Sequence, residues 1–119
     1  MKRLKESKID FKTASILDLP FSDNIFEFCY SINVIEQLPR DYFQAFTEAR
    51  RVSSLYASFF EEFLEAQKNI FQRMNLKNVD YFRSSYREVE KAGFKILKFE
   101  PSRLRKIQTS LGFLVCSKE

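Results

Sequence analysis

The pattern of apolar and polar positions divides the first third of the chain into a strand, a loop and a second strand. Over residues 8–14 apolar side chains alternate with charged ones, which predicts a short strand. Residues 17–24 hold Pro20 and a cluster of Ser, Asp and Asn, the residue types that favour turns. The aromatic run 26–30 then predicts a strand that is buried on at least one side.

The middle of the chain has the spacing of a helix. Asp41 is a candidate N-cap and Gln44 follows three residues later, a variant of the capping box. Apolar side chains then recur at helical intervals, and residues 41–75 contain neither Gly nor Pro. This pattern predicts one long Phe-rich helix, or two helices that meet at residues 53–54.

The last third begins with a Ser-x-x-Glu capping box at residues 85–88, and the helix it opens is predicted to end at Gly93. A strand follows that uses Phe94, Ile96 and either Leu97 or Phe99, and residues 111–116 form the last predicted strand. No repeat or linker interrupts the pattern, so residues 1–119 are predicted to form a single domain.

Composition supports a folded protein and narrows its chemistry. Hydrophobic residues make up 45% of the chain, with 14 Phe, which is enough for a sizeable core. The chain has no His, so it lacks the commonest metal ligand and general base, and we expect no metal site and no Ser-His-Asp triad. Cys29 and Cys116 each lie in an apolar run, which suits reduced, buried thiols.

The net charge of +4 is mild and does not require a nucleic-acid partner. We expect the basic clusters near the two ends to be solvated surface. A nucleic-acid site is the alternative, disfavoured interpretation of the residues Arg103, Arg105, Lys106, Tyr86 and Phe99. No apolar run has the length of a membrane span and no leader sequence is evident, so we expect a soluble, cytoplasmic protein without a membrane partner.

Two blocks of residues carry the only specific functional signal. Residues 18–26 read D-L-P-F-S-D-N-I-F, and residues 33–39 read N-V-I-E-Q-L-P. Together they resemble the middle of a class I S-adenosylmethionine-dependent methyltransferase, of the kind that includes the ubiquinone and menaquinone methylases. In that family the second block commonly reads N-V-L-E-H-L-P, so Gln37 stands where a His is frequent. Residues 91–97 and 112–116 are similar to the end of the same domain.

The resemblance implies a fold and a set of site residues. The expected fold class is α/β, a partial Rossmann-like methyltransferase sheet of about four strands with the long Phe-rich helix, matching the carboxyl-terminal part of the family domain. S-adenosylmethionine is the implied cofactor. Ser15 and Ile16 would lie beside its adenine, and Ser31, Ile32 and Asn33 near its methionine part and the substrate.

Each of these polar residues also has a purely structural interpretation. Ser15 can satisfy a turn backbone, and Ser31 and Asn33 can cap the end of a strand. No catalytic residue is predicted, because methyl transfer from a sulfonium depends mainly on holding donor and acceptor in line.

Parts of the family pattern are missing from the sequence. The only two glycines are Gly93 and Gly112, so no glycine-rich turn is present. The "R-V-L-x-P-G-G" turn before the family's fifth strand is also absent, since Arg51-Val52 is followed by Ser53. In the family's strand order, 3-2-1-4-5-7-6, both edges of strand 26–30 would then lack partners. We therefore expect a homo-oligomer or a partner chain that completes the sheet.

The functional hypothesis is a methyltransferase-like protein of the small-molecule methylase family that does not bind the cofactor well by itself, with enzymatic activity left open. The alternative is a non-catalytic interaction module built on the same remnant. Its predicted docking surface is the apolar helix face from Leu55 to Met74.

Overall fold

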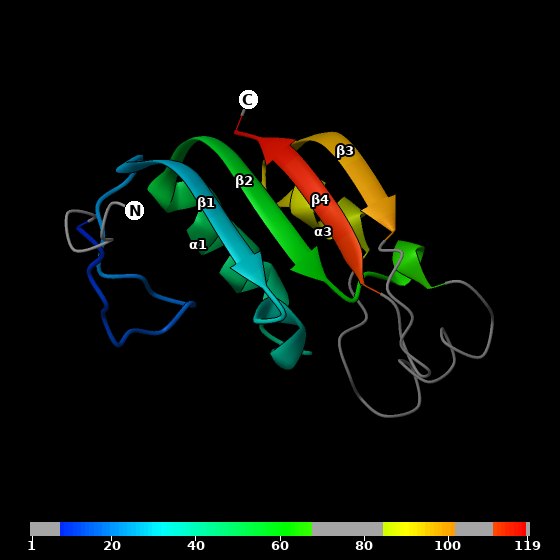
Figure 1. Ribbon diagram of the computed structural model, residues 1–119, viewed down its shortest axis with the longest axis horizontal. Helices are drawn as coiled ribbons and strands as arrows, with labels where there is room; N and C mark the ends of the chain where they lie inside the picture. Colours follow the sequence, from blue (N-terminus) through cyan, green and yellow to red (C-terminus); the bar gives the residue numbers. More distant parts are fainter. Residues whose placement is uncertain (1–7, 68–84, 102–110, 119) are drawn as a thin grey trace, which may run out of the picture.

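The structure is a computed structural model that describes residues 8–67, 85–101 and 111–118. These residues form one sheet of four strands in the order β1-β2-β4-β3 (Figure 1). β1 and β2 run parallel, and β4 is antiparallel to both β2 and β3. The strand bounds are β1 Phe26–Ile32, β2 Ser53–Glu61, β3 Lys95–Pro101 and β4 Gly112–Ser117.

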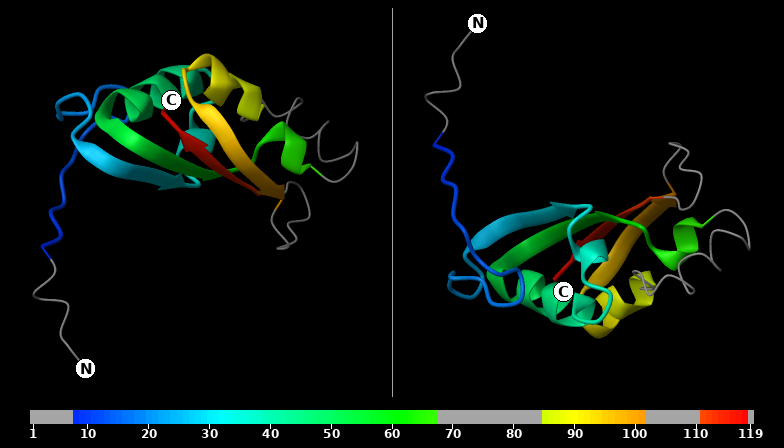
Figure 2. Two further views of the ribbon diagram at one scale, coloured as in Figure 1. Left: turned by 90° about the horizontal axis from the view of Figure 1, so that it is seen from above. Right: turned by 90° about the horizontal axis from the view of Figure 1, so that it is seen from below.

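Both described α-helices pack on the same face of this sheet (Figure 2). α1 connects the parallel pair β1 and β2, because parallel strands need a crossover, and α3 precedes β3. Short 3₁₀ turns, η2 and η3, follow β1 and β2. The helix bounds are α1 Tyr42–Val52, α3 Tyr86–Lys91, η2 Ile35–Gln37 and η3 Leu64–Ala66.

The core is an aromatic cluster between α1 and the helix-covered face of the sheet. Phe46 of α1 meets Phe59 of β2 edge to face, with ring centroids 5.0 Å apart. The ring of Phe63 stacks 6.3 Å from that of Phe46, and Phe94 lies 5.8 Å from Phe59. All four side chains are buried, so burial of Phe residues supplies the main driving force that composition predicts.

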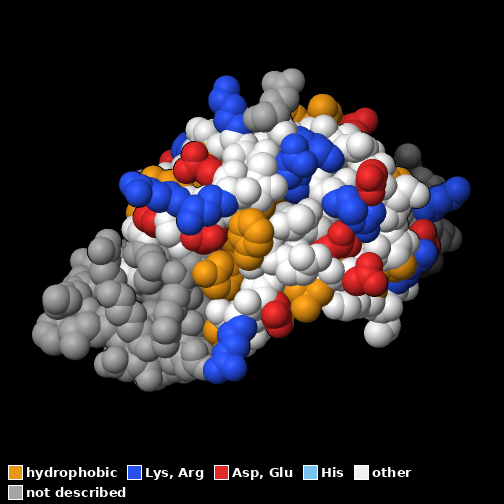
Figure 3. Space-filling view, turned by 180° about the vertical axis from the view of Figure 1, so that it is seen from behind, with side chains coloured by type: hydrophobic (Ala, Val, Ile, Leu, Met, Phe, Trp, Pro, Cys, Tyr) orange, Lys and Arg blue, Asp and Glu red, His pale blue; other side chains and the backbone are white. Residues whose placement is uncertain are grey.

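The opposite face of the sheet, called here the open face, bears Phe28, Tyr30, Ile32, Tyr56 and Phe113. No described helix covers it, and Tyr30 remains 66% exposed. Parallel sheets are normally covered on both faces. The helix side differs, since positive and negative side chains are interspersed over it (Figure 3). The open face is therefore the apolar surface of the described structure.

The prediction of a long Phe-rich helix is wrong. α1 ends at Val52, and residues 53–61 form β2. In this segment Ala57 and Phe59 point into the core while Tyr56 points to the open face, a period of two. The apolar residues at positions 55–57, 59 and 60 fit both a helical and an extended period, and pairing with β1 selects the strand. Residues 68–74 of the predicted helix lie outside the described residues.

The expectation that both edges of the strand at 26–30 lack partners is also wrong. β2 pairs with β1 from Phe26↔Ser53 to Ile32↔Phe60. The chain therefore contains a strand at the place of the family's fifth strand, although the P-G-G turn that usually precedes that strand is absent. α1 passes directly into β2, and the Ser53 N–H still donates to the Ala49 carbonyl. Of the two edges of β1, the outer one stays without a described partner.

Two smaller predictions also differ from the structure. Residues 8–14 form no described strand but an exposed arm, because no strand lies beside them to accept their hydrogen bonds. Asp41 precedes α1 without a side-chain capping bond, and Gln44 donates to the Leu17 carbonyl instead. Contacts with the preceding loop thus replace the predicted cap.

The predicted ends of the other elements are confirmed. Ser85 caps α3 by accepting a hydrogen bond from the Arg87 N–H, and Gly93 follows the helix with φ 111°. A register shift between Ile96 and Lys98 of β3 resolves the remaining alternative: Phe99, and not Leu97, contacts the core.

Alanine substitutions of two aromatic residues on β2 test the two faces of the sheet. Phe59 is 1% exposed, and we expect Phe59→Ala to lower the free energy of unfolding by about 3–5 kcal/mol. Tyr56 is 47% exposed on the open face, and Tyr56→Ala serves as the matched control, with a cost below about 1 kcal/mol. Urea unfolding measures both, and equal losses would contradict the strand assignment.

Candidate functional site

The candidate site lies where the carboxyl ends of β1 and β2 meet, the edge at which open α/β sheets bind ligands. Ser31 and Ile32 end β1, and Asn33 follows with φ 55°. Its N–H donates to the Phe60 carbonyl at 2.9 Å, which continues the parallel pairing by one residue. Asn tolerates this left-handed conformation better than most residues, and here it turns the chain away from the sheet.

The buried carboxylate of Glu61 at the end of β2 organises this turn. Its Oε1 accepts hydrogen bonds from the Ser31 hydroxyl at 2.8 Å and from the N–H groups of Val34 at 3.3 Å and Ile35 at 3.2 Å. Its Oε2 accepts from the Glu36 N–H at 3.2 Å. Burial raises the pKa of Glu61, and these hydrogen bonds oppose the rise. One side chain thus ties the two strand ends together.

Ser15 and Ile16 belong to the loop that precedes β1. The Ser15 hydroxyl oxygen accepts the Leu17 N–H at 3.2 Å, and the Asp18 N–H donates to the Ser15 carbonyl at 3.1 Å. Ser15 therefore forms the turn that its structural interpretation predicts. Ile16 is half-buried and packs against the core.

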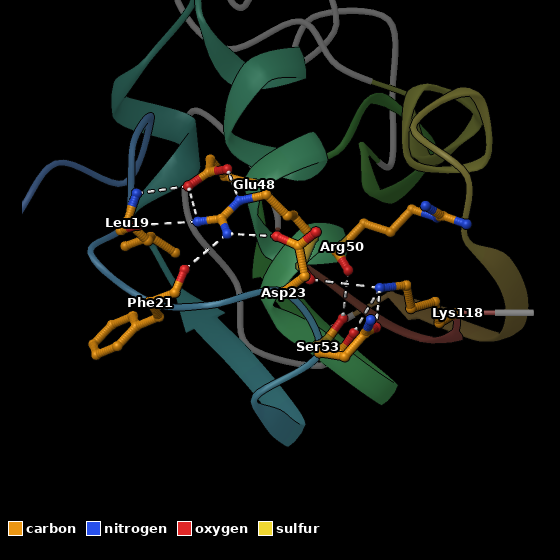
Figure 4. A network of polar contacts seen from close by, with 9 residues as sticks. Leu19, Phe21, Asp23, Glu48, Arg50, Ser53 and Lys118 are labelled. Atoms are coloured by element: carbon orange, nitrogen blue, oxygen red, sulfur yellow. Dashed lines mark hydrogen bonds and ion pairs between the residues drawn. The ribbon is translucent and has the colours of Figure 1, made fainter.

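The loop with the D-L-P-F-S-D-N block is held by the guanidinium of Arg51, which leaves the end of α1 (Figure 4). Arg51 Nη1 donates to the Phe21 carbonyl at 2.7 Å and to Asp23 Oδ1 at 2.8 Å, and Nη2 donates to the Leu19 carbonyl at 3.0 Å. Glu48 completes the cluster: it accepts from Arg51 Nε at 2.5 Å and from the Leu19 N–H at 2.6 Å.

The charges in this cluster shift the pKa values of Glu48 and Arg51 in the expected directions. The hydrogen bond to Arg51 lowers the pKa of Glu48, despite burial, and the Glu48 and Asp23 carboxylates raise the pKa of Arg51. At the chain end, Lys118 Nζ donates to the Ser53 carbonyl at 3.0 Å and to Asn24 Oδ1. Burial lowers the pKa of Lys118. The block is therefore fixed by α1 and by the end of β4.

A hollow of about 330 Å³ opens along the outer edge of β1. Ile16 and Ser31 both line it, together with Phe28, Cys29, Val52 and Phe59. Its size falls in the range of small-molecule pockets, and its lining is mainly apolar. A second, wider hollow of about 840 Å³ separates residues 8–14 from the start of β1. Both hollows are lined by residues of β1 and of the loop that precedes it.

The structure brings some of the predicted site residues together. Ile16 and Ser31 line one hollow, although the chain between them makes a loop and a strand. Ile32 instead points to the open face, and Asn33 is exposed beyond the strand end. Their part in binding stays a prediction.

Sequence reasoning missed Glu61 and Glu48. Glu61 fell inside the segment predicted as a helix, so nothing placed it beside Ser31. The spacing of Glu48 and Arg51, three residues apart on a helix, was the available signal for the second pair.

The described residues also bear on metal binding, membrane insertion and thiol chemistry. Within residues 8–67, 85–101 and 111–118 no group of acidic and cysteine side chains could hold a metal ion. None of the helices in the same ranges is long and apolar enough to cross a membrane. Cys29 and Cys116 are free thiols, and burial raises the pKa of Cys116 to about 12. The basic residues Arg103, Arg105 and Lys106 lie outside the described residues.

Comparison with known proteins supports the resemblance in sequence and in fold. Residues 1–54 match the family model described as "Methyltransferase domain". A search of the curated proteins finds no match to this sequence.

Solved structures with 10–18% identity share the fold. The [4+2]-cyclase SpnF has 14% identity and a TM-score of 0.71, over 92% of this chain and 55% of that one. A SAM-dependent methyltransferase from Methanosarcina mazei has 18% identity and a TM-score of 0.69, over 93% of this chain and 68% of that one. Geranyl diphosphate C-methyltransferase from Streptomyces coelicolor, solved with S-adenosyl-L-homocysteine, has 10% identity and a TM-score of 0.63, over 91% and 54%. This chain thus spans about half the length of the first and third of these proteins.

Substitution of Glu48 tests the cluster that holds the loop. We expect Glu48→Gln to lower the free energy of unfolding at neutral pH by about 1–3 kcal/mol, because charge-assisted bonds to Arg51 are lost. The lowered pKa of Glu48 means that its contribution is present above the ordinary glutamate pKa of about 4.3 and is lost as the pH falls through the folded-state pKa. Urea unfolding at several pH values should therefore show variant and wild type converging in acid.

Glu90, which is exposed on α3, supplies the control for this experiment. Glu90→Gln should follow the wild type at every pH. A difference between Glu48→Gln and the wild type that stays constant down to acid pH would contradict the assigned role.

Substitution of Glu61 tests the junction of the two strand ends. Glu61→Ala leaves the N–H groups of Ile35 and Glu36 buried without an acceptor, at about 1–3 kcal/mol each, so we expect a large loss of stability. Glu61→Gln keeps a carbonyl oxygen and should lose less. Hydrogen exchange at the Ile35 amide reports the junction directly. Glu100→Ala on the exposed part of β3 is the control, and equal exchange in all variants would contradict the role of Glu61.

Proposed function

This chain has the fold of the class I S-adenosylmethionine-dependent methyltransferases, and on that premise we propose that it forms the carboxyl-terminal part of a cofactor site for small-molecule methylation. The observation that carries the proposal is the hollow along the outer edge of β1, which reaches from Ile16 in the preceding loop to Ser31 near the carboxyl end of the strand. The match of residues 1–54 to the methyltransferase domain supports the cofactor class.

The side chains present suit one part of the cofactor. Ile16 offers an apolar wall beside the position proposed for the adenine, and Ser15 shapes the turn that holds it. Ser31, Ile32 and Asn33 would lie toward the methionine part. When bound, S-adenosylmethionine supplies a methyl group activated by its sulfonium. The protein residues named here would orient it and exclude water.

The remaining part of the site needs groups that these residues do not supply. The Ser31 hydroxyl is already bonded to Glu61, and that of Ser15 to its own turn. Neither glycine forms part of the candidate site, since Gly93 follows the end of α3 and Gly112 packs against Phe99. We propose that another polypeptide, either a second copy or a different chain, completes the sheet at β1 and with it the cofactor site.

A non-catalytic interaction module is the second candidate, and the open face favours it. Aromatic side chains of three strands are exposed there, as on surfaces that bind other proteins. Fold alone does not decide between the two candidates, because one protein of this fold is named a cyclase. A cytoplasmic location stays a prediction.

Titration of the ¹⁵N-labelled chain with S-adenosylhomocysteine tests the proposed cofactor site. For the chain as a monomer we expect weak binding, with a dissociation constant above about 100 μM, because only part of the site is then present. Amide shifts should cluster at Ser15, Ile16, Ile32 and Asn33. Shifts confined to α3 and β3 would contradict the proposed location, and micromolar binding would contradict the need for a second polypeptide.

Two glycine substitutions separate the side chain of Asn33 from its backbone. Asn33 and Asn24 are the described non-glycine residues with positive φ, 55° and 58°, and they lie beyond opposite ends of β1. Glycine keeps both turns free of strain. We expect Asn33→Gly to weaken the binding of S-adenosylhomocysteine by more than Asn24→Gly, the matched control, which removes the hydrogen bond from Lys118 but lies at the other end of β1. Equal weakening by both substitutions would contradict a specific role of the Asn33 side chain.

A further inference from the structure

The arm formed by residues 8–14 is exposed along its whole described length. Ile9 is 63% exposed and Phe11 92% exposed. Figure 2 shows the arm running away from the sheet. Its described contacts lie near its root, where the Lys12 ammonium sits 5.4 Å above the Phe21 ring. A large aromatic side chain this exposed, in a segment with strand-like alternation, indicates a strand without its partner.

The outer edge of β1 is the complementary feature. β1 is an edge strand of the described sheet, and it carries neither Lys nor Pro, which commonly protect such edges. Its side chains Phe28 and Tyr30 are exposed on the open face, and Glu27 lies on the opposite side. The edge therefore offers unpaired backbone groups and an apolar side to an incoming strand.

The arm matches this edge in length, in side-chain alternation and in charge. Both segments contain seven residues. If Ile9 and Phe11 extend the open face, Lys8, Asp10 and Lys12 fall on the side of Glu27, so that this side of the arm brings a net positive charge toward Glu27. A shift of the pairing register by one residue would place the charged residues of the arm beside Tyr30 and the apolar residues Ile9 and Phe11 beside Glu27, which disfavours that register.

We propose that two copies of this chain exchange arms, so that residues 8–14 of each copy pair with the outer edge of β1 in the other. This inference rests on the proposal above that another polypeptide completes the sheet, and it names that polypeptide as a second copy. Donor strand and acceptor edge lie on the same chain, so a two-fold dimer satisfies both at once and closes the assembly. A different chain would leave the arm unpaired.

Sedimentation velocity of the full chain over a range of micromolar concentrations tests the exchange. We expect a dimer for the wild type and a dissociation constant raised about tenfold or more by Phe11→Glu. Phe11 makes few contacts within its own copy, so this substitution should leave the thermal stability of the monomer unchanged. Phe43→Glu, at an exposed Phe on α1, is the matched control and should remain dimeric.

A mixing experiment identifies the two surfaces. Tyr30→Lys disrupts the edge and keeps the arm, while Phe11→Glu disrupts the arm and keeps the edge, so each variant alone should be monomeric. Their mixture should form a dimer through the one intact arm and the one intact edge. A monomeric wild type, a dimer that tolerates Phe11→Glu, or a mixture that stays monomeric would each overturn the proposal. Shifts at Asn33 with S-adenosylhomocysteine in a monomeric chain would leave the proposed function standing while arm exchange fails.

Discussion

The parallel pairing of β1 with β2 is the interaction on which the rest of the described structure depends. A parallel pair needs a crossover, and α1 supplies it, which places Phe46 over the sheet and creates the core around Phe59. The same pairing brings the carboxyl ends of the two strands together. There Glu61 bonds Ser31 and the following turn, so the site and the core arise from one arrangement of backbone.

α1 connects this core to the loop that carries the recognisable sequence block. One side of the helix packs on the sheet. Near its end, Arg51 donates to the loop carbonyls of Leu19 and Phe21, and Glu48 accepts a hydrogen bond from the Leu19 N–H. Arginine is well suited to this role because its planar fork donates several bonds in fixed directions. Much of the D-L-P-F-S-D-N block is thus explained by the need to hold a loop next to the site, in addition to any contact with a cofactor.

The structure also links the partial sheet to the proposed function. The hollow lined by Ile16 and Ser31 opens toward the unpaired edge of β1, so whatever pairs with that edge also borders the hollow. Arm exchange between two copies would pair the edge and bury Phe11, and it would place a second polypeptide next to the proposed cofactor site. Dimerisation and cofactor binding would then be coupled through β1, because the arm of the second copy would border both the strand and the hollow.

The sequence by itself determined the elements with strong local signals: the aromatic strand β1, the capped helix α3 with Gly93 beyond its end, and the final antiparallel pair. It also determined the family resemblance and the position of Ser31 and Asn33 at a strand end. Only the tertiary structure decided that residues 53–61 are a strand and that Glu61 is the partner of Ser31. The apolar residues at positions 55–57, 59 and 60 satisfy helical and extended periods alike. The choice between them depends on hydrogen bonds to a strand some thirty residues away, which local sequence does not encode.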